Sequence, residues 1–101
     1  MRTVRQLITE DKSVYIYLRN RAIAYRFLSD AEREGIPFGT KPATMAKPAK
    51  VFSLRPDGTI WYLTGFVSHM RYGHASDAVR IDYEKYVDGE AYYMHVPKRG
   101  E

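Results

Sequence analysis

Residues 61–74 hold the side chains of this sequence best suited to binding a charged, flat ligand. Arginine and histidine donate hydrogen bonds to phosphate oxygens, and aromatic rings stack on bases. The candidate residues are Trp61, Phe66, His69, Arg71, Tyr72 and His74. This pattern predicts a site for a nucleotide or nucleic acid. The alternative is structural: Phe66, Met70 and Tyr72 plug the edge of a sheet while Arg71 forms an ion pair.

A second group of candidates lies in the Pro, Ala and Lys-rich segment 39–50, which shows no hydrophobic periodicity. A connection this long is uncommon in a small domain unless it is functional or mobile. Its cations are Lys41, Lys47 and Lys50, and it contains no acid. We expect these lysines to close over a bound anion, with a solvated insertion as the alternative.

Catalytic and metal-binding patterns are weak. Ser68 and His69 are adjacent, which in an extended chain sends their side chains to opposite faces. Asp82 and Glu84 share a strand face, but solvated carboxylates are common on strands. The histidines His69, His74 and His95 lack the spacing of a zinc site. We therefore expect a non-catalytic protein without a metal or cofactor, and a small hydrolase or lyase is an alternative.

Composition sets the remaining limits. The 101 residues fit one domain, 1–101, and contain no cysteine, which suits a reducing cytoplasm. No segment approaches the roughly 20 apolar residues needed to cross a bilayer, so we expect no membrane association. Residues 1–55 hold 11 Lys and Arg against 5 Asp and Glu, whereas residues 56–101 hold 5 against 7. The basic half favours an anionic partner.

The clearest elements lie in the first two thirds of the chain. Alternating apolar residues predict a strand over 13–19. Asn20 is a suitable N-cap for a helix over 21–34, and Gly35 is a suitable C-terminal glycine. Another alternating pattern predicts a strand over 78–83, with Arg80 and Asp82 on its polar face, and 91–96 is the last expected strand. We predict an α+β fold, with one main helix on an antiparallel sheet of about four to five strands.

Residues 51–63 predict a β-hairpin, because Pro56, Asp57 and Gly58 suit a type I turn with a glycine bulge. Pairing Arg55 with Thr59 makes both faces of the hairpin apolar, so the second face needs a cover. That face carries Val51, Trp61 and Leu63. A second hypothesis is therefore a protein inhibitor that docks a host protein, or a second copy of the chain, through these residues.

Residues 23–39, the turn 55–59 and the segment 65–70 are similar to sequences of small orphan proteins of bacteriophages and prophages. The chain resembles these accessory proteins in the helix and the central hairpin. The resemblance implies a protein that binds and neutralises a host component. Nuclease inhibitors and proteins that sequester nucleotide signals belong to this class.

Overall fold

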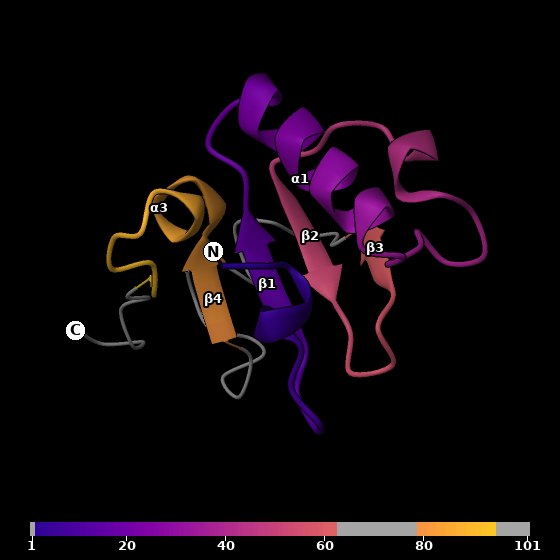
Figure 1. Ribbon diagram of the computed structural model, residues 1–101, viewed down its shortest axis with the longest axis horizontal. Helices are drawn as coiled ribbons and strands as arrows, with labels where there is room; N and C mark the ends of the chain where they lie inside the picture. The colour runs from indigo at the N-terminus through magenta and orange to yellow at the C-terminus, as the bar shows by residue number, and fades with distance from the viewer. Residues whose placement is uncertain (1, 63–78, 95–101) are drawn as a thin grey trace, which may run out of the picture.

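The computed structural model describes residues 2–62 and 79–94, which form one mixed β-sheet with helices packed on it (Figure 1). The strand order is β3-β2-β1-β4. The strands are β1 (Val14–Tyr17), β2 (Val51–Leu54), β3 (Ile60–Tyr62) and β4 (Val79–Asp82). The helices are α1 (Arg21–Arg33) and α3 (Tyr83–Val87), with 3-10 turns η1 (Arg5–Leu7) and η2 (Ala43–Met45). The predicted α+β fold with one main helix is confirmed.

One strand pairing differs from the expected antiparallel sheet. β2 is antiparallel to both β1 and β3, but β1 and β4 are parallel. Only an antiparallel pair can be joined by a tight turn, whereas β1 and β4 are separated by the helix and the hairpin. On the far side of β4, Ile81 forms an isolated antiparallel bridge with Tyr93. Residues 95 and 96 of the expected strand 91–96 lie outside the described residues.

The hairpin has the predicted register. Ser53 pairs with Trp61, and the Arg55 N–H donates to the Thr59 carbonyl at 2.9 Å. Gly58 has a φ of 83°, the left-handed conformation that closes this turn at little cost only for glycine. Turn chemistry therefore fixes which side chains of β2 and β3 share a face.

Helix α1 begins and ends at the residues that its sequence indicates. The Asn20 side chain accepts a hydrogen bond from the Ile23 N–H at 2.9 Å, which caps the first turn. At the other end Gly35 adopts a φ of 77°, and the Ile36 N–H donates to the Ala31 carbonyl. This pairing is the Schellman arrangement, which satisfies carbonyls that the helix leaves without partners.

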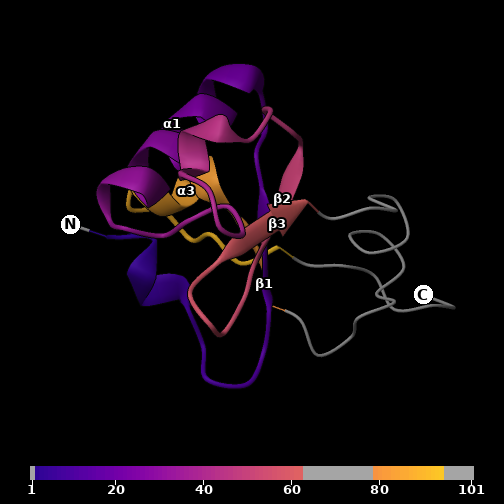
Figure 2. The same ribbon diagram turned by 90° about the vertical axis from the view of Figure 1, so that its right-hand side faces the viewer.

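The core lies between the sheet and α1, and Figure 2 shows α1 and α3 on the same side of the sheet. Phe27 of α1 is fully buried between Phe52 and Tyr83, with ring centroids 5.8 and 5.1 Å away. Within the described ranges no helix is long and apolar enough to cross a bilayer. The buried apolar residues of the sheet that face α1 are Val14, Ile16, Phe52, Leu54, Ile60 and Ile81.

On the opposite face of the sheet the polar residues of β4 are also buried, which corrects the expectation of a half-buried strand. Arg80 and Asp82 are only 8% and 5% exposed. The Arg80 guanidinium lies 5.6 Å from the centroid of the Tyr15 ring, and Asp82 forms an ion pair with Arg19. Asp82 also ends β4 one residue early, because its side chain accepts from the Lys85 N–H and caps α3.

Segment 39–50 packs along α1, so it is not simply a solvated insertion. Ala43 and Ala46 are buried, and the Thr44 N–H and hydroxyl both donate to the Glu32 carboxylate. The Lys47 N–H donates to the Tyr62 hydroxyl at 2.8 Å. These contacts fix the backbone that leads into β2.

Candidate functional site

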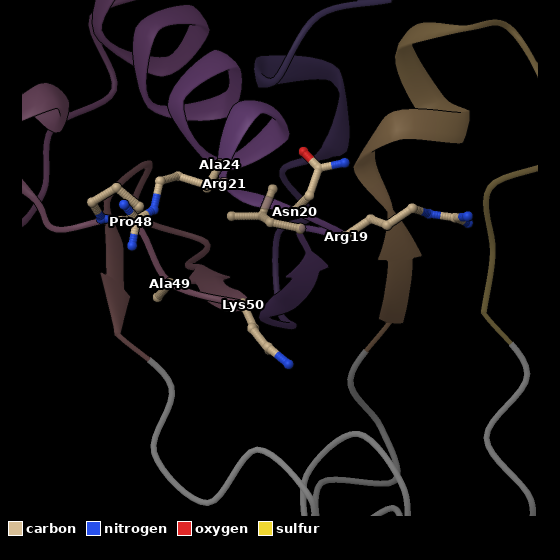
Figure 3. Close-up of a pocket in the computed structure, with 8 residues that line it drawn as sticks. Arg19, Asn20, Arg21, Ala24, Pro48, Ala49 and Lys50 are labelled. Carbon is tan, nitrogen blue, oxygen red and sulfur yellow. The ribbon is translucent and has the colours of Figure 1, made fainter.

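A cavity of about 220 Å³ opens where the end of β1, the first turn of α1 and the start of β2 meet. The backbone pairing of the sheet continues into this corner, because the Leu18 N–H donates to the Lys50 carbonyl at 2.7 Å. Leu18 and Ala24 are buried, so the cavity has an apolar floor with polar groups at its rim. The lining residues are Leu18, Arg19, Asn20, Arg21, Ala24, Pro48, Ala49 and Lys50 (Figure 3).

The three cations of the lining differ in their partners. Arg19 binds Asp82 and Glu84 at 3.0 and 3.2 Å, and its side chain extends away from Lys50 (Figure 3). The hydrogen bond to Asp82 and the two carboxylate charges raise the pKa of Arg19 above its ordinary value. Arg21 and Lys50, by contrast, have no carboxylate within 4.0 Å among the residues the structure describes. The cavity therefore has two cations available to an anion.

The start of α1 adds backbone donors to the same corner. The first N–H groups of a helix have no intrahelical acceptor, and the helix dipole gives this end partial positive charge. Asn20 satisfies the N–H of Ile23, which leaves those of Arg21 and Ala22 without an acceptor among the described residues. These groups reinforce the positive potential that Arg21 and Lys50 create.

The cavity wall formed by residues 48–50, across from α1, is held in place by contacts outside the cavity. Lys47 immediately precedes Pro48, and its N–H is fixed by the hydroxyl of Tyr62 in β3. Thr44 ties the preceding turn to Glu32 of α1. Because the wall is anchored at both α1 and β3, the fold fixes the backbone of Lys50 relative to that of Arg21.

Many sequence-predicted site residues lie outside the described part of the chain. They are Leu63, Phe66, Ser68, His69, Arg71, Tyr72 and His74. Lys50 lines the cavity, whereas Lys41 and Lys47 are exposed and do not appear among its lining residues. The cavity thus brings together Lys50 and a residue that the sequence interpretation did not select, Arg21. An arginine directly after a helix N-cap was the available sign.

Trp61 is 43% exposed, but the described structure already gives its ring a partner. Phe38 stacks on it with centroids 4.5 Å apart and planes 10° apart. Gly39 approaches closely, since a Cβ there would lie 3.0 Å from the indole ring. The Arg55 guanidinium is 5.9 Å from the ring centroid. Trp61 is consequently part of an aromatic cluster at the β3 edge, outside the lining of the cavity.

The structure also describes residues that belong to the two alternative hypotheses, a protein-docking face and a hydrolase. Val51, one of the three residues proposed for docking a partner protein, is only 3% exposed. Asp82 and Glu84, the carboxylate pair considered for a hydrolase, share Arg19 as a partner, and Glu84 lies in α3 rather than on the strand. Among the described residues no cluster of His, Asp or Glu has the arrangement of a metal site.

Comparisons with protein-family models, with curated proteins and with solved structures found no match. The chemistry of the cavity is therefore argued from its residues alone. None of the described lining side chains is a carboxylate, imidazole, hydroxyl or thiol. The lining is suited to holding an anion and offers no acid–base pair or oxygen or sulfur nucleophile.

Proposed function

We propose that this protein is a non-catalytic binding protein that holds a small phosphate-bearing ligand in the cavity beside the start of α1. The observation that carries the proposal is the pair Arg21 and Lys50. They line one cavity of about 220 Å³ and have no carboxylate partner among the described residues. Cations of a folded protein that border a cavity without acidic partners are available for an anion.

An oxyanion such as phosphate suits this arrangement better than a simple halide. Arginine presents several donors in a planar fork that matches two phosphate oxygens, and lysine adds a compact charge. Arg21 and Lys50 come from different elements, and the Lys50 ammonium points away from Arg21 in Figure 3, so this long side chain turns toward the anion on binding. The apolar floor formed by the buried Leu18 and Ala24 lowers the local dielectric on one side of the anion.

The proposal agrees with the expectation from the sequence that the ligand is anionic and is sequestered rather than converted. In a small accessory protein of the phage type, such a site would remove a nucleotide signal from the host cell by binding it. The cavity differs from the site expected at residues 61–74, because the described cations come from α1 and from the residue before β2.

Calorimetric titration with inorganic pyrophosphate tests the proposal. We expect saturable binding that Arg21→Ala and Lys50→Ala each weaken about tenfold, because each substitution removes a charge-assisted hydrogen bond. Lys12→Ala is the matched control, since Lys12 is exposed and precedes the opposite end of β1. Absence of binding, or equal weakening by Lys12→Ala, would contradict the proposal.

Mass spectrometry of the protein purified under native conditions gives an independent test. A sequestering protein retains its ligand through purification when dissociation is slow. We expect an added mass that carries phosphate and that is lost in Arg21→Ala. A retained mass without phosphate, present equally in both proteins, would point to a different ligand class.

A further inference from the structure

The exposed aromatic rings of the described chain differ in whether another ring already contacts them. Trp61 stacks on Phe38 at 4.5 Å, and Tyr93, which is 71% exposed, stacks on Tyr92 at 4.7 Å. Tyr25 is 56% exposed and has no ring contact, hydrogen bond or ion pair within the described ranges. Among the large exposed rings of this part of the chain, Tyr25 is thus the one that no other ring contacts.

Tyr25 lies beside the cationic cavity. It follows Arg21 by four residues in α1, and residues at this spacing are neighbours on a helix surface, with Cβ atoms about 5 to 6 Å apart. Arg21 lines the cavity, whereas Tyr25 lies one turn farther along the exposed surface of the helix and outside the lining. An anion at Arg21 would therefore have an exposed aromatic ring about one helical turn away.

We infer that the ligand is a mononucleotide whose phosphate lies between Arg21 and Lys50 and whose base stacks on Tyr25. The inference rests on the proposed function and adds the second half of the ligand. In a mononucleotide a single pentose joins the phosphate to a flat aromatic base, so one small molecule can reach both residues. Base stacking on an aromatic side chain is a sequence-tolerant source of affinity.

The observations favour a mononucleotide over a nucleic-acid strand. Proteins that hold single strands place cations and stacking rings repeatedly along a groove that follows the backbone. The described structure supplies two cations without a carboxylate partner, Arg21 and Lys50, and one ring near them, Tyr25. Farther along α1, the next arginines, Arg26 and Arg33, are both paired with Asp30. The cationic surface of the helix is therefore not continuous.

The test compares adenosine 5′-monophosphate with ribose 5-phosphate by calorimetry, because the two share the phosphate and the pentose and differ in the base. We expect the nucleotide to bind about tenfold more tightly, the effect of one stacked base. Tyr25→Ala should reduce nucleotide affinity to that of ribose 5-phosphate and leave ribose 5-phosphate binding unchanged. Tyr25→Phe, which keeps the ring, should retain the preference.

Tyr93→Ala is the matched control, since it removes an exposed tyrosine from the bridge beside β4. We expect it to leave both affinities unchanged. Equal affinity for the two ligands, or an unaltered preference in Tyr25→Ala, would overturn the inference while leaving the phosphate site in place. Failure of both compounds to bind would overturn the proposed function with it. Tighter binding of a single-stranded oligonucleotide than of the nucleotide would overturn the assignment to a mononucleotide.

Discussion

The two ends of α1 differ in whether their charged side chains have partners in the fold. At the C-terminal end Asp30 pairs with Arg33 at 2.8 Å and with Arg26 at 3.7 Å, and it accepts a hydrogen bond from the buried Tyr83 hydroxyl. At the N-terminal end Arg21 has no carboxylate partner in the described structure. The charges at the C-terminal end are therefore paired within the fold, whereas Arg21 at the N-terminal end lines a cavity.

The C-terminal end of α1 also anchors the start of the chain. The Glu34 carboxylate accepts hydrogen bonds from the backbone N–H groups of Val4 and Arg5, both at 2.9 Å. The space that Glu34, Arg2 and Tyr83 help to line at this end is only about 60 Å³. If the proposed site is correct, a charged helix end binds a ligand only where its charges lack partners within the fold. The following predictions test it from the largest expected effect to the smallest.

Removing Asp30 should cost the most stability. Asp30→Ala leaves the Tyr83 hydroxyl without its acceptor and frees Arg26 and Arg33 from their shared carboxylate. We expect the free energy of unfolding to fall by about 2 kcal/mol in chemical denaturation. Pyrophosphate affinity, corrected for the unfolded fraction, should be unchanged.

Asp11→Ala is the control for Asp30→Ala, because it removes the same charge from an exposed turn. We expect a change in unfolding free energy of less than about 0.5 kcal/mol. An equal loss of stability in the two variants would show that the ion pairs and the hydrogen bond of Asp30 do not stabilise the fold.

Tyr83 should give the fold a distinctive alkaline sensitivity. Burial, and then the hydrogen bond to Asp30, raise the pKa of Tyr83 far above its ordinary value. Above pH 10 the unfolded chain loses this proton and the folded chain keeps it, so stability falls as pH rises. We expect this group to contribute a slope of about 1.4 kcal/mol per pH unit.

Tyr83→Phe isolates that contribution. The variant should lose less stability than the wild type between pH 10 and pH 11, as measured by denaturation at each pH. The remaining slope includes Tyr86, whose pKa burial also raises. Identical slopes in the two proteins would contradict the assignment of Tyr83 as a proton held in the folded state.

Lys41 should give the smallest effect and sharpen the limits of the cavity. It belongs to the same lysine-bearing segment as Lys50 but does not line the cavity. We expect Lys41→Ala to weaken pyrophosphate binding by less than about twofold, because an exposed charge farther away is screened by solvent and salt. A tenfold loss, as large as that expected for Lys50→Ala, would mean that the whole segment closes over the ligand.

Local chemistry explains what the sequence predicted correctly. Asn20 and Gly35 delimit α1, and the Pro56 to Gly58 turn sets the hairpin register, since each acts over only a few residues. The parallel pairing of β1 with β4 was not predictable in this way, because no local turn relates those strands. Likewise Tyr83 was expected in the strand 78–83, but Asp82 ends that strand and caps the helix that starts at Tyr83.

The candidate site was harder to predict, because long-range contacts determine which residues are free. Lys50 was selected for its lysine-rich segment, but Arg21 becomes its neighbour only when β2 pairs with β1. Trp61 was selected as a stacking surface, but the bridge between Phe38 and Ile60 brings another ring onto it. Composition identifies cations and rings, whereas only the fold identifies those without partners.

Amide chemical shifts measured by nuclear magnetic resonance during a pyrophosphate titration test the difference between the two helix ends most directly. We expect the largest saturable shifts at Arg21, Ala22 and Lys50, with the amides of Asp30 and Arg33 unchanged. Shifts concentrated at Asp30 and Arg33, or a titration that leaves Arg21 and Lys50 unmoved, would contradict the placement of the ligand at the start of α1.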